Sequence, residues 1–287
     1  MKISQNDSLV ISSRRNPLVR KLRAISRKAG REEYSMLLLE GTHLLQEALN
    51  TDLSPKQIIA TSSWIQRNSQ ILQSLSSGIE IIKVTQSVLE AALTTVKPDG
   101  VASLFPLSGL PAKPKNPKFI LALDRLQDPG NLGNLFRTAL AADIEFVLLA
   151  SGADPLNQKV LRSSAGSILH LPYERLGITE SEGLSLLSKK LIDFAGNGFQ
   201  VIATSAPNKK GLNSFIPYWE IDWSQPTVLV LGNEGSGLHS ELENCCTKVV
   251  TLPHSVSVES LNVAAASVPL LLERRRAKMI KGIHQKL

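Results

Sequence analysis

The chain of 287 residues has little cysteine and few aromatic residues (5%). Its two cysteines, Cys245 and Cys246, are adjacent, and adjacent cysteines make a poor structural disulfide. The sequence has no Cys-x-x-Cys pair and no cluster of cysteine with histidine that would bind zinc. These absences exclude a disulfide-stabilised secreted domain and a zinc module. They predict a protein of a reducing compartment that binds no metal.

Signals for secretion and for membrane insertion are also missing. Residues 1–15 are polar and end in two arginines, so they lack the apolar core of a secretory signal. No apolar run approaches the ~20 residues that a membrane-spanning helix needs. We therefore expect a cytoplasmic protein with no membrane partner.

Positive charge is what the sequence does have, with a formal net charge of +7 at pH 7. Such a balance favours a polyanionic partner. Eight lysines and arginines, and no acid, occur from Arg14 to Arg31. A solvated helix face is one interpretation, but such a face usually includes acids that pair with its cations. We therefore predict that this run contacts RNA, through Arg14, Arg15, Arg20, Lys21 and Arg23.

The composition changes between residues 97 and 118, where five prolines interrupt any long helix or strand. This change predicts an amino-terminal domain at 1–107, a linker at 108–117 and a second domain at 118–287. The first is expected to be a small α/β domain, with a helix at 18–29 and strands at 36–40, 57–61 and 80–84.

After the linker, strands alternate with helices, a pattern typical of a mostly parallel sheet with covered faces. The strands are expected at 119–124, 146–150, 199–204, 227–232 and 249–253, and the helices at 132–142, 155–165, 184–196 and 260–278. The fold class is therefore α/β. Ligands of such sheets bind beyond the carboxyl ends of the strands, which directs attention to the loops there.

The first of these loops, at 127–134, follows the strand at 119–124. Its Asp-Pro-Gly is a turn, and Asn131 would serve as the N-cap of the next helix, which is a purely structural interpretation. The functional interpretation is that a helix N-terminus behind a strand binds anions. Arg137 follows Asn131 by somewhat less than two helical turns, which would bring both side chains near the same opening.

The second loop, at 232–237, has three glycines around Glu234. Glycines let a backbone approach a flat ligand closely, although a merely flexible loop is the alternative. A carboxylate in the middle argues against a bound pyrophosphate, and the spacing is not Gly-x-Gly-x-x-Gly. A nucleotide-dependent oxidoreductase of the Rossmann type is therefore the weaker alternative.

The third loop, at 251–262, leads into an alanine-rich helix. Ser260 is a natural N-cap for that helix, whereas capping explains Asn262 less well. A fourth loop begins at Thr204, at the end of an apolar strand, and says little by itself.

Taken in order, three segments resemble the motifs of the SpoU (TrmH-type) RNA ribose 2′-O-methyltransferases of the SPOUT superfamily. They read DPGNLGNLFRTALAADIEFVLL, LVLGNEGSGL and LPHSVSVESLNVAAASVPLLLE, and the resemblance covers residues 119–276. The segments ISSRRNPLVRKLR and LLLEGTHLLQEAL also resemble the family's amino-terminal RNA substrate-binding domain. One departure is that His254 and Val256 stand where relatives usually carry an apolar residue and a glycine.

The resemblance implies an α/β fold with a deep carboxy-terminal trefoil knot, a homodimer, and S-adenosylmethionine as the cofactor. It implies transfer of a methyl group to a ribose 2′-hydroxyl of a structured RNA, with 23S-type ribosomal RNA preferred over transfer RNA. By position, the cofactor-binding residues are Thr204, Gly232, Leu252 and Leu261. The matching catalytic set is Asn131, Arg137, Glu234, Ser260 and Asn262.

By the same resemblance, Arg137 acts beside the ribose hydroxyl, either as a base or by stabilising the phosphate and the developing alkoxide. Asn131, Ser260 and Asn262 would orient it. Glu234 would hold the loop or pair with Arg137. A non-catalytic RNA-binding or ribosome-assembly protein that keeps the fold is the remaining alternative.

Overall fold

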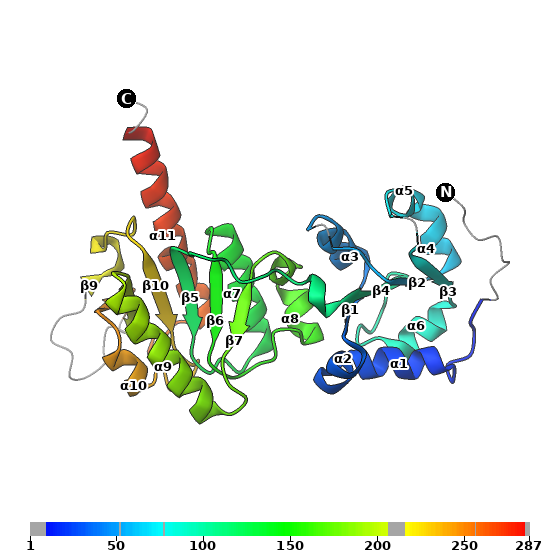
Figure 1. Cartoon of the computed structure of the whole chain (residues 1–287), viewed down its shortest axis with the longest axis horizontal. Coiled ribbons are helices and arrows are strands. Elements are labelled where there is room, and N and C mark those ends of the chain that lie inside the picture. The colour runs from blue at the N-terminus through cyan, green and yellow to red at the C-terminus, as the bar shows by residue number, and fades with distance from the viewer. Residues whose placement is uncertain (1–9, 52, 77, 206–215, 256, 285–287) are drawn as a thin grey trace. The chain divides into compact units, whose positions relative to one another are not determined.

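A computed structural model describes residues 10–51, 53–76, 78–205, 216–255 and 257–284. The chain forms two compact units (Figure 1). The first contains the described residues up to Leu110 together with Asp154–His170, and the second contains Pro111–Ala153 and the described residues from Leu171 onward. A segment between two strands of the second unit therefore belongs to the first unit.

The first unit has a four-stranded sheet in the order β1-β4-β2-β3. Its strands are β1 (Met36–Glu40), β2 (Gln57–Ala60), β3 (Glu80–Lys83) and β4 (Val101–Pro106). β2 pairs with β3 in parallel, and β4 pairs antiparallel with both β1 and β2. Its helices are α1 (Pro17–Ile25), α2 (Lys28–Tyr34), α3 (Thr42–Leu49), α4 (Ser62–Arg67), α5 (Ser69–Gln73), α6 (Gln86–Ala92) and α8 (Gln158–Ser163). All three strands predicted for this domain are confirmed.

The single helix predicted at 18–29 is wrong, because the chain turns between α1 and α2. Asn16 caps α1 by accepting a hydrogen bond from the backbone N–H of Leu18, and the helix ends at Ile25. α2 then packs so closely that a Cβ on Gly30 would lie 2.1 Å from the carbonyl oxygen of Ala24. Only glycine permits this approach, and the helical spacing of the apolar residues does not reveal it.

Polar contacts hold the segment Asp154–His170 within the first unit. The buried guanidinium of Arg31 pairs with Asp154. The amide of Gln158 donates to the carbonyl of Leu38 at 2.9 Å, and His170 contacts Glu47 at 3.0 Å. The helix predicted at 155–165 is shorter, at Gln158–Ser163. Its place in the first unit follows from these contacts, which a local sequence pattern does not contain.

The second unit has a seven-stranded sheet in the order β7-β6-β5-β10-β8-β11-β9, and all its strand pairs are parallel. The strands are β5 (Phe119–Leu123), β6 (Phe146–Leu149), β7 (Tyr173–Arg175), β8 (Gln200–Ser205), β9 (Ile216–Pro217), β10 (Thr227–Leu231) and β11 (Lys248–Thr251). β5 and β10 are buried throughout, as expected for central parallel strands with both faces covered. The predicted α/β class and the mostly parallel sheet are confirmed.

Helices cover this sheet. They are α7 (Pro129–Ala141), α9 (Glu180–Gly196), α10 (Ser240–Asn244) and α11 (Val263–His284). α9 buries Leu187 and Leu191 in a core that includes residues of β6, β8 and β10, and α11 packs against α7. Among the described residues, no helix is both long enough and apolar enough to cross a membrane.

Candidate active site

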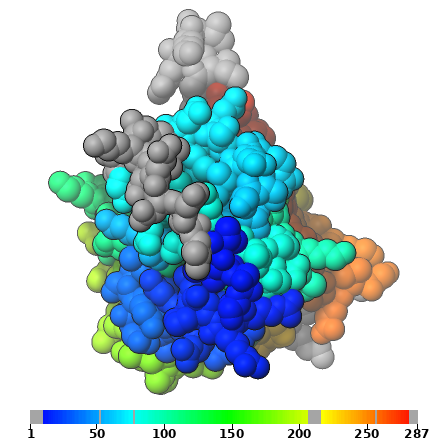
Figure 2. Space-filling view, turned by 90° about the vertical axis from the view of Figure 1, so that its right-hand side faces the viewer, coloured from blue at the N-terminus to red at the C-terminus, as the bar shows by residue number. Residues whose placement is uncertain are grey.

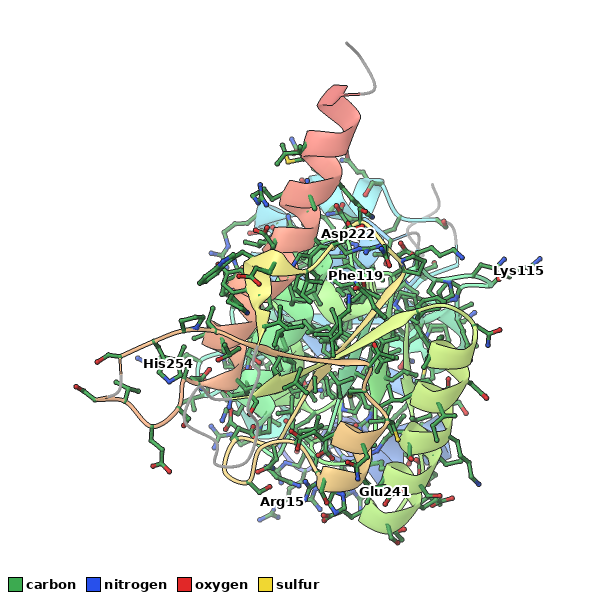
Figure 3. The ribbon with its side chains drawn as sticks, turned by 90° about the vertical axis from the view of Figure 1, so that its left-hand side faces the viewer. Arg15, Lys115, Phe119, Asp222, Glu241 and His254 are labelled. Atoms are coloured by element: carbon green, nitrogen blue, oxygen red, sulfur yellow. The ribbon has the colours of Figure 1, made fainter. Side chains whose placement is uncertain are left out.

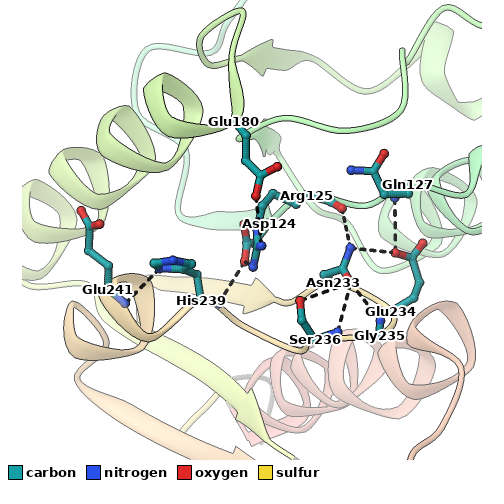
Figure 4. Close-up of polar contacts among 10 residues, drawn as sticks. All are labelled: Asp124, Arg125, Gln127, Glu180, Asn233, Glu234, Gly235, Ser236, His239 and Glu241. Atoms are coloured by element: carbon teal, nitrogen blue, oxygen red, sulfur yellow. Dashed lines mark hydrogen bonds and ion pairs between the residues drawn. The ribbon is translucent and has the colours of Figure 1, made fainter.

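A buried ion pair lies where β5 ends. The carboxylate of Asp124 is fully buried and accepts two hydrogen bonds from Arg125, at 2.8 and 3.0 Å. It also accepts one from the backbone N–H of His239 at 3.1 Å (Figure 4). Arg125 reaches Glu180 as well, at 3.2 Å, and the hydrogen bond to Asp124 raises the pKa of its guanidinium. These contacts join the end of β5 to the segment that follows the loop at 232–237.

The glycine loop that follows β10 is closed by its own backbone. Asn233 and Gly237 exchange backbone hydrogen bonds of 3.0 and 3.1 Å, and the Asn233 side chain accepts from the N–H groups of Gly235 and Ser236. A Cβ on Gly232 would lie 2.2 Å from the backbone nitrogen of Leu238. Gly237 has a φ of +69°, which disfavours other residues. The fold of the loop itself therefore requires two of its glycines.

Glu234 connects this loop to the start of α7. Its carboxylate accepts hydrogen bonds from the backbone N–H groups of Gln127 and Asp128, at 3.3 and 3.2 Å, and from the amide of Asn131 at 3.2 Å. Burial would raise the pKa of Glu234, but hydrogen bonds from its own backbone, from Asn131 and from the two N–H groups together lower it. Glu234 is therefore a carboxylate at neutral pH.

Asn262 extends this network to α11. Its amide donates to the side-chain oxygen of Asn131 at 2.9 Å, so a chain of hydrogen bonds runs from Asn262 through Asn131 to Glu234. Its own oxygen accepts from the backbone N–H groups of Ala264 and Ala265, at 3.0 and 3.2 Å. Asn262 is thus the residue that caps α11.

Two predictions about helix caps are wrong. Ser260 was expected to cap the last helix, but that helix begins at Val263, behind Asn262. Asn131 was expected to cap the helix after β5, but Asp128 does so by accepting from the N–H of Asn131 at 2.9 Å. The freed side chain of Asn131 is therefore available to bridge Asn262 and Glu234.

A pocket of about 670 Å³ lies beyond the carboxyl ends of β8, β10 and β11. All four residues predicted to bind the cofactor line it, as do Glu234 and Ser260. The four are Thr204, Gly232, Leu252 and Leu261. The structure therefore brings together three loops that are far apart in the sequence, while the roles of these residues stay predictions.

His254 also lines this pocket, from the loop between β11 and α11 (Figure 3). Its Nδ1 lies 2.8 Å from the carbonyl oxygen of Leu252, so this nitrogen carries the proton and donates it. Val256, the second departure from the family pattern, lies outside the described residues.

Arg137 lies on α7, is exposed, and is not among the residues that line the pocket. No partner of its guanidinium occurs in the part of the chain that the structure describes. The predicted alternative of an ion pair between Glu234 and Arg137 is therefore wrong, because Glu234 faces the N–H groups at the start of α7 instead. The contacts within the predicted set join Asn131, Glu234 and Asn262.

The residues predicted to contact RNA belong to α1 and the segment before it. The side chains of Arg14, Arg15, Arg20 and Arg23 are exposed, and Arg14 lies 3.9 Å from Glu90. Lys21 is half-buried and donates to Gln57 at 3.3 Å. Arg23 donates to the carbonyl of Ala91 at 2.6 Å.

Sequence reasoning missed the ion pair of Asp124 and Arg125. It also missed that Asn233 closes the loop at 232–237 through its backbone and side-chain hydrogen bonds. A charged residue directly after five apolar strand residues was a signal for Asp124, because strand ends of this sheet class carry ligands. Among the described residues, no group of three or more His, Cys, Asp or Glu side chains could hold a metal ion.

Both cysteines are free, and burial raises the pKa of Cys246 to about 12.

Comparison with known proteins shows two matching families. Residues 118–271 match the SpoU rRNA Methylase family, and residues 16–103 match the MRM3-like substrate binding domain. An uncharacterised tRNA/rRNA methyltransferase of Synechocystis sp. is 38% identical, over 94% of this chain and 95% of that protein. The 23S rRNA (guanosine(2553)-2′-O)-methyltransferase RlmP of Bacillus subtilis is 30% identical, over 92% of this chain and 98% of its own length.

Solved structures agree with these matches. The AdoMet-bound rRNA methyltransferase of Sinorhizobium meliloti superposes with a TM-score of 0.75 and 28% identity. The superposition covers 94% of this chain and 98% of that one. Both units of the present chain thus have counterparts in a protein solved with AdoMet bound.

Proposed function

The chain belongs to the SpoU rRNA methylase family, and from this premise we propose that it transfers a methyl group from S-adenosylmethionine to a ribose 2′-hydroxyl of ribosomal RNA. The observation that carries the proposal is the pocket beyond β8, β10 and β11, together with the hydrogen-bonded chain Asn262–Asn131–Glu234 beside it. RlmP, a 2′-O-methyltransferase of 23S rRNA aligned over nearly the whole chain, supports the choice of substrate.

The residues present in the pocket fit S-adenosylmethionine. Leu231, Leu252 and Leu261 would offer apolar surface to the cofactor, and the loop at 232–237 would offer backbone donors and acceptors to its polar groups. The carboxylate of Glu234 suits a ligand that carries a positive sulfonium. When bound, this cofactor supplies a methyl group that is already activated by the positive charge on sulfur.

The protein's own residues then have to orient the ribose and assist loss of its proton. Glu234, with its lowered pKa, is a weak base, so its contribution is to hold the loop against α7. The hydrogen bonds from Asn262 to Asn131 and from Asn131 to Glu234 fix the loop and α11 against the start of α7, the helix that carries Arg137. Because a guanidinium stays protonated, Arg137 stabilises the developing charge on the ribose oxygen or grips the neighbouring phosphate.

We extend the proposal to a homodimer. Apolar side chains on α11 are exposed in the single chain, among them Val268 (39%), Leu272 (39%) and Met279 (63%). A second copy would cover this surface and bring a further polar surface to Arg137, which is free of partners in the described chain. An RNA substrate of the ribosome also favours a cytoplasmic location.

The test is methyl transfer from labelled S-adenosylmethionine to an unmodified 23S rRNA transcript, with the modified position mapped as a 2′-O-methyl. Arg137→Ala should lower turnover by about 100-fold or more while cofactor binding is unchanged, because only charge stabilisation in the transition state is lost. Lys189→Ala, at an exposed cation on α9 of the second unit, is the control. Full turnover of the Arg137→Ala variant, or methylation of transfer RNA in place of 23S rRNA, would contradict the proposal.

A further inference from the structure

A second hollow of about 420 Å³ lies entirely within the first unit. It is formed by the end of α1, the residues after α6 and the helix α8. Four cations line it, namely Arg23, Arg27, Lys159 and Arg162, and none of the described residues that line it is acidic. Ser26, Thr94 and Asn157 add hydroxyl and amide groups to its wall. Such a hollow attracts an anion that offers several oxygens.

Two of the arginines are held on one side and free on the other. Arg162 Nη1 donates to Thr94 Oγ1 at 2.8 Å and pairs with Glu40 at 3.3 Å. Arg23 Nε donates to the carbonyl of Ala91. The remaining nitrogens of both guanidinium groups have no partner among the described residues. A guanidinium fixed in this way loses little rotamer entropy when it binds a phosphate through two hydrogen bonds.

A buried carboxylate beside the hollow, that of Glu40, is already neutralised. Glu40 is buried, and it accepts hydrogen bonds from the backbone N–H and the hydroxyl of both Thr94 and Thr95, besides the contact with Arg162. Its charge therefore positions Arg162 and leaves the charges of Arg23 and Arg27 uncancelled. Arg27 is exposed, and no partner of its guanidinium lies in the described part of the chain.

The cations come from two distant parts of the sequence. Arg23 and Arg27 belong to the basic run at the start of the chain, and Figure 2 shows α1 on the face of the first unit, beside the surface that follows α6. Lys159 and Arg162 come from the segment that lies, in sequence, between β6 and β7 of the methylase unit. The hollow is therefore complete only when this segment is part of the first unit.

We propose that this hollow binds a phosphodiester of the RNA substrate, with Arg23, Arg27, Lys159 and Arg162 as its cations. The proposal rests on the proposed function, because that function supplies the RNA. Of the residues predicted to contact RNA it keeps Arg23 and omits Arg14, Arg15, Arg20 and Lys21, which do not line the hollow. It adds Arg27, between α1 and α2, and two residues of α8.

The experiment measures the affinity of the full-length protein for a 23S rRNA transcript over a series of salt concentrations. The variants are Arg23→Gln/Arg27→Gln on one side of the hollow and Lys159→Gln on the other. Arg162 is left intact because its loss would expose the buried charge of Glu40. Arg67→Gln, an exposed arginine of α4 outside the hollow, is the matched control. Far-ultraviolet circular dichroism and thermal unfolding establish that each variant is folded.

The double variant should bind the transcript about tenfold more weakly, because two charge-assisted contacts with phosphate are lost. Its plot of log affinity against log salt concentration should be less steep by about 1.5, and that of Lys159→Gln by about 0.8. The reason is that binding releases fewer counterions from the RNA when fewer of its phosphates are contacted. Arg67→Gln should match the wild type. Unchanged affinity and slope in both hollow variants would overturn the proposal.

Inorganic phosphate serves as a second probe. If the hollow variants lose phosphate binding and bind the transcript like the wild type, the hollow takes a free anion and the proposal is wrong. Methyl transfer is measured in parallel to separate the two proposals. If the variants bind RNA more weakly but the wild type transfers no methyl group, the hollow is supported and the proposed function is contradicted. If the wild type transfers methyl groups but the variants bind RNA as tightly as it does, the proposed function is supported and the hollow is contradicted.

Discussion

Two carboxylates, Glu40 in the first unit and Glu234 in the second, perform the same local task in different surroundings. Each accepts backbone N–H groups from a loop distant in sequence, at Thr94 and Thr95 for Glu40, and at Gln127 and Asp128 for Glu234. Glu40 is buried and has a cationic partner. Glu234 is half-buried, and its third contact is the neutral amide of Asn131.

The difference shows how one type of contact supports stability in one unit and a site in the other. A buried carboxylate with an ion-pair partner cannot be removed without leaving groups unsatisfied, so Glu40 is expected to matter for folding. Glu234 lies at the wall of a pocket, where water can replace lost hydrogen bonds. Its removal should therefore change the order of the pocket more than the stability of the unit.

The largest expected effect on stability is that of Glu40→Ala. It removes the acceptor of four threonine donors and the partner of Arg162, and we expect the free energy of unfolding to fall by about 3 kcal/mol. Denaturant unfolding measures this. Glu90→Ala, at an exposed acid of the same unit, is the control and should change stability little. A loss for Glu40→Ala no larger than that of the control would contradict the role assigned to Glu40.

The next effect concerns the loop that Glu234 holds. Gly232→Ala would place a methyl group against the backbone of Leu238, so we expect destabilisation by about 2 kcal/mol and a loss of S-adenosylmethionine binding. Gly235→Ala is a matched control, because the nearest atom to its Cβ would be 3.7 Å away. Thermal unfolding and calorimetric titration compare the two variants. Equal behaviour of both would show that the loop tolerates a side chain at Gly232.

Glu234→Ala should cost about 1 kcal/mol of stability, less than Glu40→Ala, because the freed N–H groups reach solvent. Methyl transfer should nevertheless fall by about 100-fold, because the start of α7 and the loop lose their common acceptor. Glu234→Gln keeps one acceptor oxygen, so its rate of methyl transfer should lie between those of the wild type and Glu234→Ala. The comparison fails if Glu234→Ala proves as destabilising as Glu40→Ala while its turnover stays normal.

The smallest effect is a dependence on pH. The pKa of Glu234 is lowered below its ordinary value of 4.5, so its carboxylate stabilises the folded protein at pH values above that ordinary value. This contribution should disappear as the pH falls through the lowered pKa of the folded state. The free energy of unfolding of the wild type and of Glu234→Gln should therefore converge as the medium is acidified from about pH 6 to about pH 3. A difference that stays constant over this range would show that Glu234 is not held as a carboxylate.

The sequence predicted most of the fold because apolar runs and helical spacing are local properties. The strands β5, β6, β8, β10 and β11 begin and end within two residues of the predicted positions. The assignment of Lys159 and Arg162 to the first unit could not be predicted, because it depends on long-range contacts such as that of Gln158 with Leu38. A trefoil knot was expected only from the family resemblance, since knots are nearly absent among folds.

The candidate site was predicted in part for the same reason. The three loops were found because their residue types are unusual, and the pocket unites Thr204, Gly232, Leu252 and Leu261. The caps were assigned to the wrong residues, because Asp128 and Asn262 compete with Asn131 and Ser260 for neighbouring N–H groups. Only the three-dimensional arrangement shows that Asn131 is left to join Asn262 to Glu234.

The central claim is that the pocket beyond β8, β10 and β11 holds the methyl donor, and calorimetric titration of the full-length protein with S-adenosylmethionine tests it most directly. A parallel titration with NAD serves as the control for a nucleotide of another class. We predict saturable binding of S-adenosylmethionine, no binding of NAD, and loss of the first in Gly232→Ala. Binding of NAD, or no binding of S-adenosylmethionine even when the 23S rRNA transcript is present, would contradict the account.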